Sequence, residues 1–489
     1  MSGALPIPLD QGPAVGRAVR NSANSLSASL PVTNPTKAFW THSTPDCNPL
    51  AAEGSDGPLT AEADVCIIGS GITGVSIAYH LSNLIKKGDS ANPRVVIIEA
   101  RDFCSGATGR NGGHLTAHNF LDFASNWKAY GLEEAKRAFE IENYTSTEID
   151  QIVRKHGLQQ VVDYVVGGRT VPAFSDNELD EMKTSYEAAK AAGLDVSSIE
   201  WLSSHQVQEK YGASYPAIRQ PGCNLWPLKL VTALYQIVQE ARKLDVHLHT
   251  RTPVTAVDGG PGHWVLQTPR GTISTPTVIH ATNGYASHLL PHLAGSSGIV
   301  PVRGQVLALR ASTSAEALTR SSWLANEGFE YWFPRPVHGE VELPIVILGG
   351  GRETAGPTFE TFESDDSLLN PRVGSALRKF LPTVFPGKYE EGSDSNVLME
   401  WTGIMGHTRS GDPLVGPVID SNGDDKAFAG QYICAGYTGH GMPRAYACAE
   451  TIARIVAAKL SGSDEWEVPS WLPRHYLTSA RPGDGLRAT

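Results

Sequence analysis

The chain has 489 residues, a length that predicts two domains rather than one hydrophobic core. Its formal net charge of -11 provides no basic surface for nucleic acid or for an anionic membrane, so neither is expected as a partner. No apolar run reaches the about 18 residues of a membrane-spanning helix, and the N-terminus lacks a basic start followed by an apolar stretch, which together predict a cytoplasmic protein. Six scattered cysteines without a Cys-x-x-Cys pair indicate neither a disulfide framework nor a metal site.

The first segment, residues 1–60, is rich in Ser, Pro, Ala and Asn and shows little periodicity. This composition predicts an arm that becomes ordered by contact with the rest of the protein, not a domain of its own. Phe39 and Trp40 are the candidates that anchor this arm.

A short apolar strand then leads directly into the motif Gly-x-Gly-x-x-Gly over residues 69–74 and into a predicted helix over 75–86. In this arrangement Gly69 permits a tight turn, Gly71 lets the backbone approach a pyrophosphate, and Gly74 lets the helix pack on the strand. The N-terminus of the helix offers unpaired N–H groups to the phosphates. The motif therefore predicts a dinucleotide-binding unit.

The second strand of this unit spans residues 94–99 and ends in Glu99, an acid of the kind that accepts hydrogen bonds from ribose hydroxyls. Glu99 follows the glycine motif by more than the usual distance of about 20 residues. The polar insert 87–93 accounts for the delay as a lengthened loop. Residues 106–113 then contain four glycines, a composition that suits backbone lying against a ligand.

The remaining elements follow in chain order. The patterns predict helices over 132–156, 179–192, 230–244 and 442–458 and strands over 161–166, 247–254, 264–267, 277–281 and 329–335. Ser175 and Glu178 resemble a capping box at the start of the second of these helices. His247 and His249 alternate along a strand, which predicts that both lie on one solvated face.

Four separated motifs resemble the D-amino-acid oxidase-like family of FAD-dependent oxidoreductases, which includes glycine oxidase, monomeric sarcosine oxidase and γ-glutamylputrescine oxidoreductase. They are residues 69–74 with Glu99, the loop 105–113, the strand end 278–284, and the segment 436–442. The resemblance covers about residues 60–460, and the Gly-Arg-Asn-Gly-Gly form of the loop is most similar to the γ-glutamylputrescine oxidoreductase branch.

The resemblance implies an α/β fold: a Rossmann-like FAD-binding domain and a discontinuous α+β substrate domain built on an antiparallel or mixed sheet. The implied limits are an arm over 1–60, the FAD-binding domain over 61–114, 222–300 and 396–460, the substrate domain over 115–221 and 301–395, and a tail over 461–489.

The resemblance also implies which residues hold FAD. The expected set is Gly69, Gly71, Ile72, Thr73, Gly74, Glu99, Ala100, Arg101, Ser105, Gly106, Ala107, Thr108, Arg110, Asn111, Gly112, Gly113, His114, Val254, Ala281, Thr282, Asn283, Gly403, Met405, Thr438, Gly439, His440, Gly441 and Met442. The catalytic candidates are Tyr331, His407, His440 and Arg303, and the substrate-lining candidates are Tyr331, Trp332 and Trp401.

Two departures from the family refine this expectation. Monomeric sarcosine oxidase carries a carboxylate-binding lysine after Gly-His-Gly-Phe, whereas here Met442 and Pro443 follow Gly441, so the sequence favours an amine over an α-amino acid unless Arg444 or Arg335 substitutes. Relatives that bind flavin covalently use a cysteine where Met405 stands or a histidine where Arg110 stands. The resemblance therefore implies non-covalent FAD.

The function implied is oxidation of a carbon–nitrogen single bond of a small amine by hydride transfer to flavin, giving an imine that water hydrolyses. Dioxygen or another acceptor reoxidises the flavin. The alternatives are an oxidase of an α-amino or imino acid and a non-catalytic flavin-binding protein.

Overall fold

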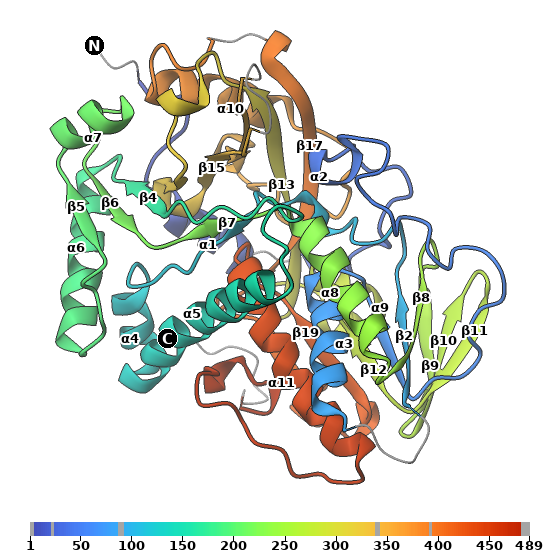
Figure 1. Cartoon of the computed structure of the whole chain (residues 1–489). Helices are drawn as coiled ribbons and strands as arrows, with labels where there is room; N and C mark the ends of the chain where they lie inside the picture. Colours follow the sequence, from blue (N-terminus) through green and yellow to red (C-terminus); the bar gives the residue numbers. More distant parts are fainter. Residues whose placement is uncertain (1–3, 21–23, 87–91, 338–342, 391–393, 481–489) are drawn as a thin grey trace.

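Two large sheets organise the protein (Figure 1). The computed structural model describes residues 4–20, 24–86, 92–337, 343–390 and 394–480. Most of the polar insert expected over 87–93 and the end of the predicted tail lie outside these ranges. Within them the combination of a parallel sheet with helices and a separate mixed sheet confirms the expected fold class, while the limits of the two domains stay a prediction.

The first sheet is parallel except for one edge strand. Among the described residues its order is β18 (Leu414–Pro417), β19 (Gln431–Ala435), β12 (Val278–His280), β1 (Val65–Ile68), β2 (Arg94–Ile98) and β8 (Asp245–His249), with β18 antiparallel. The central strands are continuous apolar runs because both faces are covered. One face of the sheet forms a hydrophobic cluster with the helices α3 (Ile72–Leu84), α8 (Pro227–Ala241) and α11 (Met442–Leu460).

The opposite face of this sheet is covered by a small antiparallel sheet. Its strands are β9 (Ala256–Gly260), β10 (His263–Thr268) and β11 (Gly271–Thr275). Trp264 and Leu266 of β10 pack there with Cys66 and Val96 of the parallel sheet.

The second sheet is mixed, because β14 and β4 run parallel within an otherwise antiparallel arrangement. Its order in the described chain is β17 (Val397–Thr408), β13 (Ile299–Arg310), β16 (Ile345–Gly350), β15 (Glu330–Pro334), β14 (Ser322–Ala325), β4 (Arg169–Pro172), β6 (Ala217–Gln220) and β5 (Glu200–Leu202). Alternate residues point to opposite faces. One face, with Leu307, Trp332 and Leu348, packs in a cluster with residues of α10 (Pro371–Val384).

Seven further α-helices and one short ribbon complete the described part of the chain. They are α1 (Gly12–Arg20), α2 (Phe39–His42), α4 (Phe123–Tyr130), α5 (Leu132–Lys155), α6 (Asp176–Ala191), α7 (Ser204–Tyr211) and α9 (Ala286–Leu289), and a short ribbon joins β3 (His114–Leu115) to β7 (Cys223–Asn224). The capping box at α6 is confirmed, since Ser175 Oγ accepts from Glu178 N and the Glu178 carboxylate accepts from Ser175 N. No helix in the described ranges combines the length and the apolar character needed to cross a membrane.

The strand expected over 161–166 is wrong. The segment consists of turns, with one isolated bridge between Val165 and Asn224, and the strand β4 begins only at Arg169. The reason is Asp163, which has φ 49°, a left-handed conformation that interrupts an extended chain. Its carboxylate is bonded to Arg335.

The N-terminal arm is anchored by Trp40, which is fully buried. Its ring packs against Phe39, Trp226 and Phe333, with centroid separations of 5.7, 5.4 and 6.4 Å. The indole Nε1 donates to the carbonyl oxygen of Asn111 at 2.5 Å. The arm therefore contacts the glycine-rich loop directly.

The position of Trp332 in the core predicts a large effect on stability. Trp332 stacks on Trp323 at 5.4 Å, and Trp332→Ala should lower the free energy of unfolding by about 3–5 kcal/mol through the cavity that it leaves. Urea unfolding followed by fluorescence measures the change. Trp127→Ala, at a position that is 37% exposed, is the matched control and should change the stability little. Equal effects of the two substitutions would contradict the packing described.

Candidate functional site

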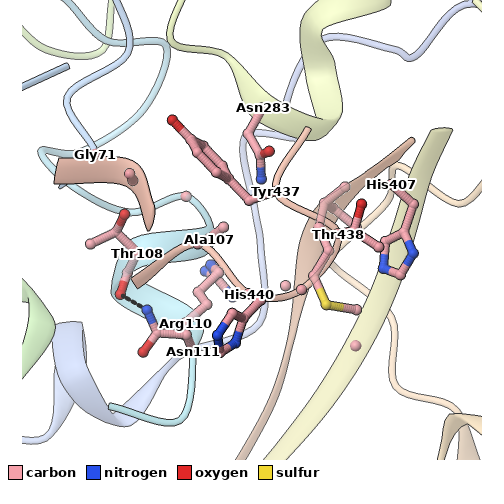
Figure 2. Close-up of a pocket in the computed structure, with 18 of the residues that line it drawn as sticks. Gly71, Ala107, Thr108, Arg110, Asn111, Asn283, His407, Tyr437, Thr438 and His440 are labelled. Carbon is pink, nitrogen blue, oxygen red and sulfur yellow. Dashed lines mark hydrogen bonds between the residues drawn. The ribbon is translucent and has the colours of Figure 1, made fainter. Parts of the chain in front are cut away.

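A cavity of about 620 Å³ lies between the two sheets. Its walls come from the end of β1 and the turn after it, from the loop after β2, and from β13, β15 and β17 of the mixed sheet. The segment 437–443 closes another side. Figure 2 shows Gly71, Thr108, Asn283, Tyr437 and His440 gathered around this space from distant parts of the chain.

The glycine turn after β1 has the geometry that its sequence predicts. Gly69 has φ 115°, which favours glycine, and a Cβ on Gly74 would lie 1.9 Å from the carbonyl oxygen of Gly69. Gly74 therefore permits close packing of α3 on the strand and does not itself line the cavity. The backbone N–H of Ile72, in the first turn of α3, donates to Thr108 Oγ1 at 3.0 Å, which joins the turn to the second glycine-rich loop.

Glu99 ends β2 at the cavity. Its carboxylate accepts hydrogen bonds from the backbone N–H of Ser70 at 3.1 Å, the hydroxyl of Ser70 at 2.8 Å and the backbone N–H of Arg101 at 3.0 Å. These bonds fix the orientation of the carboxylate at the edge of the cavity.

A buried carboxylate, Asp366, holds the second glycine-rich loop in place. Arg101 Nη1 donates to both of its oxygens, at 2.8 and 3.0 Å, and Arg110 Nε lies 3.5 Å from Asp366 Oδ2. The Arg110 guanidinium also donates to the carbonyl oxygens of Thr402 on β17 and of Thr36 in the arm, both at 2.8 Å. Burial lowers the pKa of Arg110 to about 10. No sequence motif predicts this role for Asp366.

The mixed sheet contributes an aromatic ring to the cavity. The ring of Tyr331 lies edge-on to His114 at 5.6 Å. A Cβ on Gly112 or Gly349 would lie within 2.4 Å of this ring, so both positions require glycine. Burial raises the pKa of Tyr331 to about 12, which keeps its hydroxyl protonated.

A half-buried cation, Arg352, lies beside this ring. Its guanidinium carbon lies 5.1 Å from the centre of the Phe329 ring, and Nη1 lies 3.5 Å from His407 Nε2. Within the described part of the chain, no carboxylate forms an ion pair with it within 4.0 Å. Burial lowers the pKa of Arg352 to about 10, and burial together with the Arg352 charge holds the pKa of His407 well below its usual range. At neutral pH Arg352 is therefore charged and His407 is neutral.

Two buried glutamates, Glu330 and Glu353, lie near Arg352 without an ion pair to it within 4.0 Å among the described residues. Burial, and then the charge of Glu353, raises the pKa of Glu330 well above its usual range, and burial also raises the pKa of Glu353. Glu330 is held by Asn326 Nδ2 at 2.9 Å and by the backbone N–H of Gly351 at 2.8 Å. The pair therefore retains a proton and carries at most one negative charge beside Arg352.

His440 belongs to a third cluster on the cavity wall. Its Nε2 lies 3.2 Å from Glu142 Oε2, and its ring centre lies 3.7 Å from that of His118. Burial, with a smaller effect of His118, lowers the pKa of His440 to about 3. Arg444 Nε donates to the other oxygen of Glu142 at 2.7 Å.

The comparisons with known proteins agree with this geometry. The sequence pattern of the family described as FAD dependent oxidoreductase matches residues 64–455. The chain belongs to this family. It is 24% identical to the probable oxidoreductase OrdL of Rhizobium meliloti (strain 1021), over 83% of this chain and 86% of that protein. It is 25% identical to γ-glutamylputrescine oxidoreductase of Escherichia coli (strain K12), over 82% and 84% of the two chains.

A solved structure shows the same fold. Glycine oxidase from Geobacillus kaustophilus superposes with a TM-score of 0.63 and 19% sequence identity, covering 84% of this chain and 98% of that chain.

The cavity fits FAD, the cofactor of the family. The glycine turn and the N-terminus of α3 provide the surface that a diphosphate needs, and Glu99 provides the acceptor for a ribose. Thr282 Oγ1 and Tyr285 OH are buried at the cavity without a hydrogen-bond partner among the described residues. A polar ligand in the cavity would provide the missing hydrogen bonds.

Most of the residues expected to hold FAD line this one cavity. They are Gly69, Gly71, Ile72, Thr73, Glu99, Ala100, Arg101, Gly106, Ala107, Thr108, Arg110, Asn111, Gly112, His114, Val254, Ala281, Thr282, Asn283, Gly403, Met405, Thr438, Gly439, His440, Gly441 and Met442. Gly74, Ser105 and Gly113 do not line it. The Ser105 carbonyl instead accepts from Arg101 and Arg110, and Gly113, with φ 77°, turns the chain behind the loop.

Three predicted site residues lie away from the cavity. Trp332 and Arg303 point to the opposite face of the mixed sheet, because side chains alternate along a strand. Trp332 is in the core, and Arg303 is bonded to Glu360 at 2.5 Å. Trp401 is fully buried and donates from Nε1 to the carbonyl oxygen of Arg110 at 2.8 Å, so it supports the loop from behind. The lining and flavin-facing positions expected for these residues are wrong.

The two arginines considered as carboxylate anchors are also engaged elsewhere. Arg444 pairs with Glu142, and Arg335 pairs with Asp163 away from the cavity lining. Arg352 is one of the cations that line the cavity, and the sequence predicted no role for it, because its only local signal is the preceding run of three glycines. His249 is buried and bonded to Thr60, so the solvated face expected for it is wrong as well.

The position of Glu99 predicts a defined effect on FAD affinity. Glu99→Gln removes the charge and turns one acceptor into a donor, so the Kd for FAD should rise about 10- to 100-fold, the range for a charged hydrogen bond worth about 1.5–3 kcal/mol. Titration of the apoprotein with FAD, followed by quenching of flavin fluorescence, measures Kd. Glu133→Gln, on the exposed side of α5, is the matched control. A Kd unchanged from that of the control would refute the assignment of Glu99.

Proposed function

We propose that this protein oxidises a carbon–nitrogen single bond in a small amine that also carries an anionic group, as an α-amino or imino acid does. The product is an imine, which water hydrolyses to a carbonyl compound and an amine or ammonia. FAD, when bound, accepts the hydride. The observation that carries this proposal is the half-buried cation Arg352, which has no ion pair in the described chain and faces the cavity.

An isolated buried charge is costly unless a partner compensates it. The neutral His407 and the face of Phe329 compensate Arg352 only in part. A carboxylate on the substrate would supply the missing charge, and a planar guanidinium binds it through two parallel hydrogen bonds. The sequence favoured an amine without a carboxylate, because the lysine of monomeric sarcosine oxidase is missing; Arg352 shifts that preference towards an amino or imino acid.

The charges in the cavity also favour the reactive form of the amine. An ammonium group has no lone pair to expel hydride, so the site must favour the neutral amine. The positive charge of Arg352 lowers the pKa of an amine bound nearby. The neutral imidazole of His407 adds no further cation to the cavity. The Tyr331 hydroxyl remains a donor that can orient the substrate.

The names of the relatives support this substrate class. One relative is named for an amine, γ-glutamylputrescine, and a solved structure is named for the amino acid glycine. We further propose that FAD is bound non-covalently, because Met405 and Arg110, which stand where covalent relatives carry a cysteine or a histidine, provide no nucleophile. Reoxidation by dioxygen or by another acceptor completes the cycle.

Replacement of Arg352 tests the anion-binding role. Arg352→Ala should raise KM for α-amino or imino acid substrates about 10- to 100-fold, since a charged hydrogen bond is worth about 1.5–3 kcal/mol. Arg352→Lys should retain part of the affinity. Anaerobic bleaching of the flavin absorbance by a panel of amines, with and without a carboxylate, measures the effect, and Arg372→Ala, an exposed position, is the control. Bleaching only by amines that lack an anion would refute the anionic class, and bleaching by none would refute catalysis.

The pH dependence of kcat/KM tests the protonation states. The rate should fall as pH drops through the pKa of the substrate ammonium group, because the reactive neutral amine is lost. His407, whose pKa lies well below its usual range, should add no inflection near pH 6.5, so His407→Asn should leave the shape of the profile unchanged. In the pH dependence of kcat, Arg352→Ala should move the inflection to higher pH, because removal of a cation raises the pKa of the bound amine. A shift to lower pH would contradict this account.

A further inference from the structure

Part of the cavity wall comes from the N-terminal arm, outside the segment that matches the family. The match begins at residue 64, whereas α1 lines the cavity through both of its glycines and through Val15, Val19 and Arg20. Leu30 and Pro31, farther along the arm, also line it. This wall is therefore an addition to the family pattern.

Hydrogen bonds hold the arm on both sides of α1. Before the helix, Asn326 Nδ2 donates to the carbonyl oxygen of Pro8 at 3.3 Å, and the backbone N–H of Gly12 donates to Glu327 Oε1 at 3.1 Å. After it, the backbone N–H of Ala28 donates to Ser287 Oγ at 2.9 Å. The first residue of α1 and the arm at Ala28 are therefore both hydrogen-bonded to the rest of the protein.

The inner side of α1 is apolar and lies on the face of the mixed sheet that carries the site. Val19 packs in a cluster with Val300 and Val302 of β13 and with Met405 of β17. In the strand register Val300 is opposite His407 and Val302 is opposite Met405, so these four side chains share one face. Val19 therefore borders the same space as the neutral histidine.

We propose that α1 is the specificity-determining wall of the substrate cavity, in which Val15 and Val19 limit the size of the apolar group that the substrate carries. This inference rests on the proposed function for the identity of the substrate. The ligand class is an amino or imino acid with a small apolar substituent, whose anion binds Arg352 and whose substituent contacts the two valines.

The composition of α1 suits a wall that is held by its ends. The helix has nine residues, two of them glycines, and so has little intrinsic stability. A Cβ on Gly12 would lie 1.9 Å from Glu327 Oε2, so a larger residue at this end would force the Glu327 side chain to shift. Substitutions at Val15 and Val19 should consequently change the cavity without disturbing either large sheet.

The test uses the holoenzyme with both valines truncated, Val15→Ala/Val19→Ala. With substrates of increasing side-chain length, the ratio of kcat/KM for the longer to the shorter substrate should rise at least about 10-fold, the discrimination expected per methylene group in an apolar pocket. The same variant should expose FAD to a soluble collisional quencher such as acrylamide, so quenching of flavin fluorescence should increase. Arg17→Ala, on the exposed side of the same helix, is the control and should change neither measurement.

A second substitution keeps the test decisive if the double variant folds poorly. Val19→Phe should narrow the cavity, reduce kcat/KM for the longer substrates and decrease quenching by acrylamide. Unchanged quenching and unchanged substrate preference in a folded variant would overturn the proposal. If no amine reduces the flavin, the proposed function fails, yet the quenching experiment still decides whether α1 covers the cavity.

Discussion

The site depends on one buried carboxylate, that of Asp366. Arg101 and Arg110 flank the glycine-rich loop after β2. Asp366, in contrast, lies in the segment that connects β16 of the mixed sheet to the helix α10. A carboxylate without water is stable only when its partners are present, so the two halves of the cavity wall must form together. Because Thr36 and Thr402 bond to the same Arg110 guanidinium, the arm and β17 are tied to the loop by a single set of charges.

The sequence predicted the features that depend on local chemistry. The turn at Gly69, the packing at Gly74 and the acid Glu99 each follow from the few residues around them, and the structure contains all three as expected. The capping box at Ser175 is local in the same sense. These motifs also sufficed for the resemblance to the family, because their glycines need specific backbone conformations that other residues rarely adopt.

Features that depend on distant contacts could not be predicted. Alternation shows that Tyr331 and Trp332 point to opposite faces, but not which face meets the cavity, and the structure gives that position to Tyr331. The same ambiguity explains Arg303. Arg352 belongs to no sequence motif. It matters because no carboxylate of the described residues forms an ion pair with it, and the absence of an ion pair can be seen only in the structure. The contact of α1 with the cavity joins segments that are far apart in the sequence. Gly12 and Glu327, which are hydrogen-bonded, are separated by 315 residues.

The strand order of the parallel sheet has a consequence for the way the protein is made. During synthesis β1, β2 and β12 leave the ribosome well before β19 (Gln431–Ala435), the neighbour of β12. Until then β12 has an unpaired edge, which is prone to association with other chains. The nascent chain therefore cannot complete the cofactor cradle before β19 and the segment 437–443 have been translated. Although α1 precedes them in the chain, its contact with the cavity forms only after β13 and β17 have been translated.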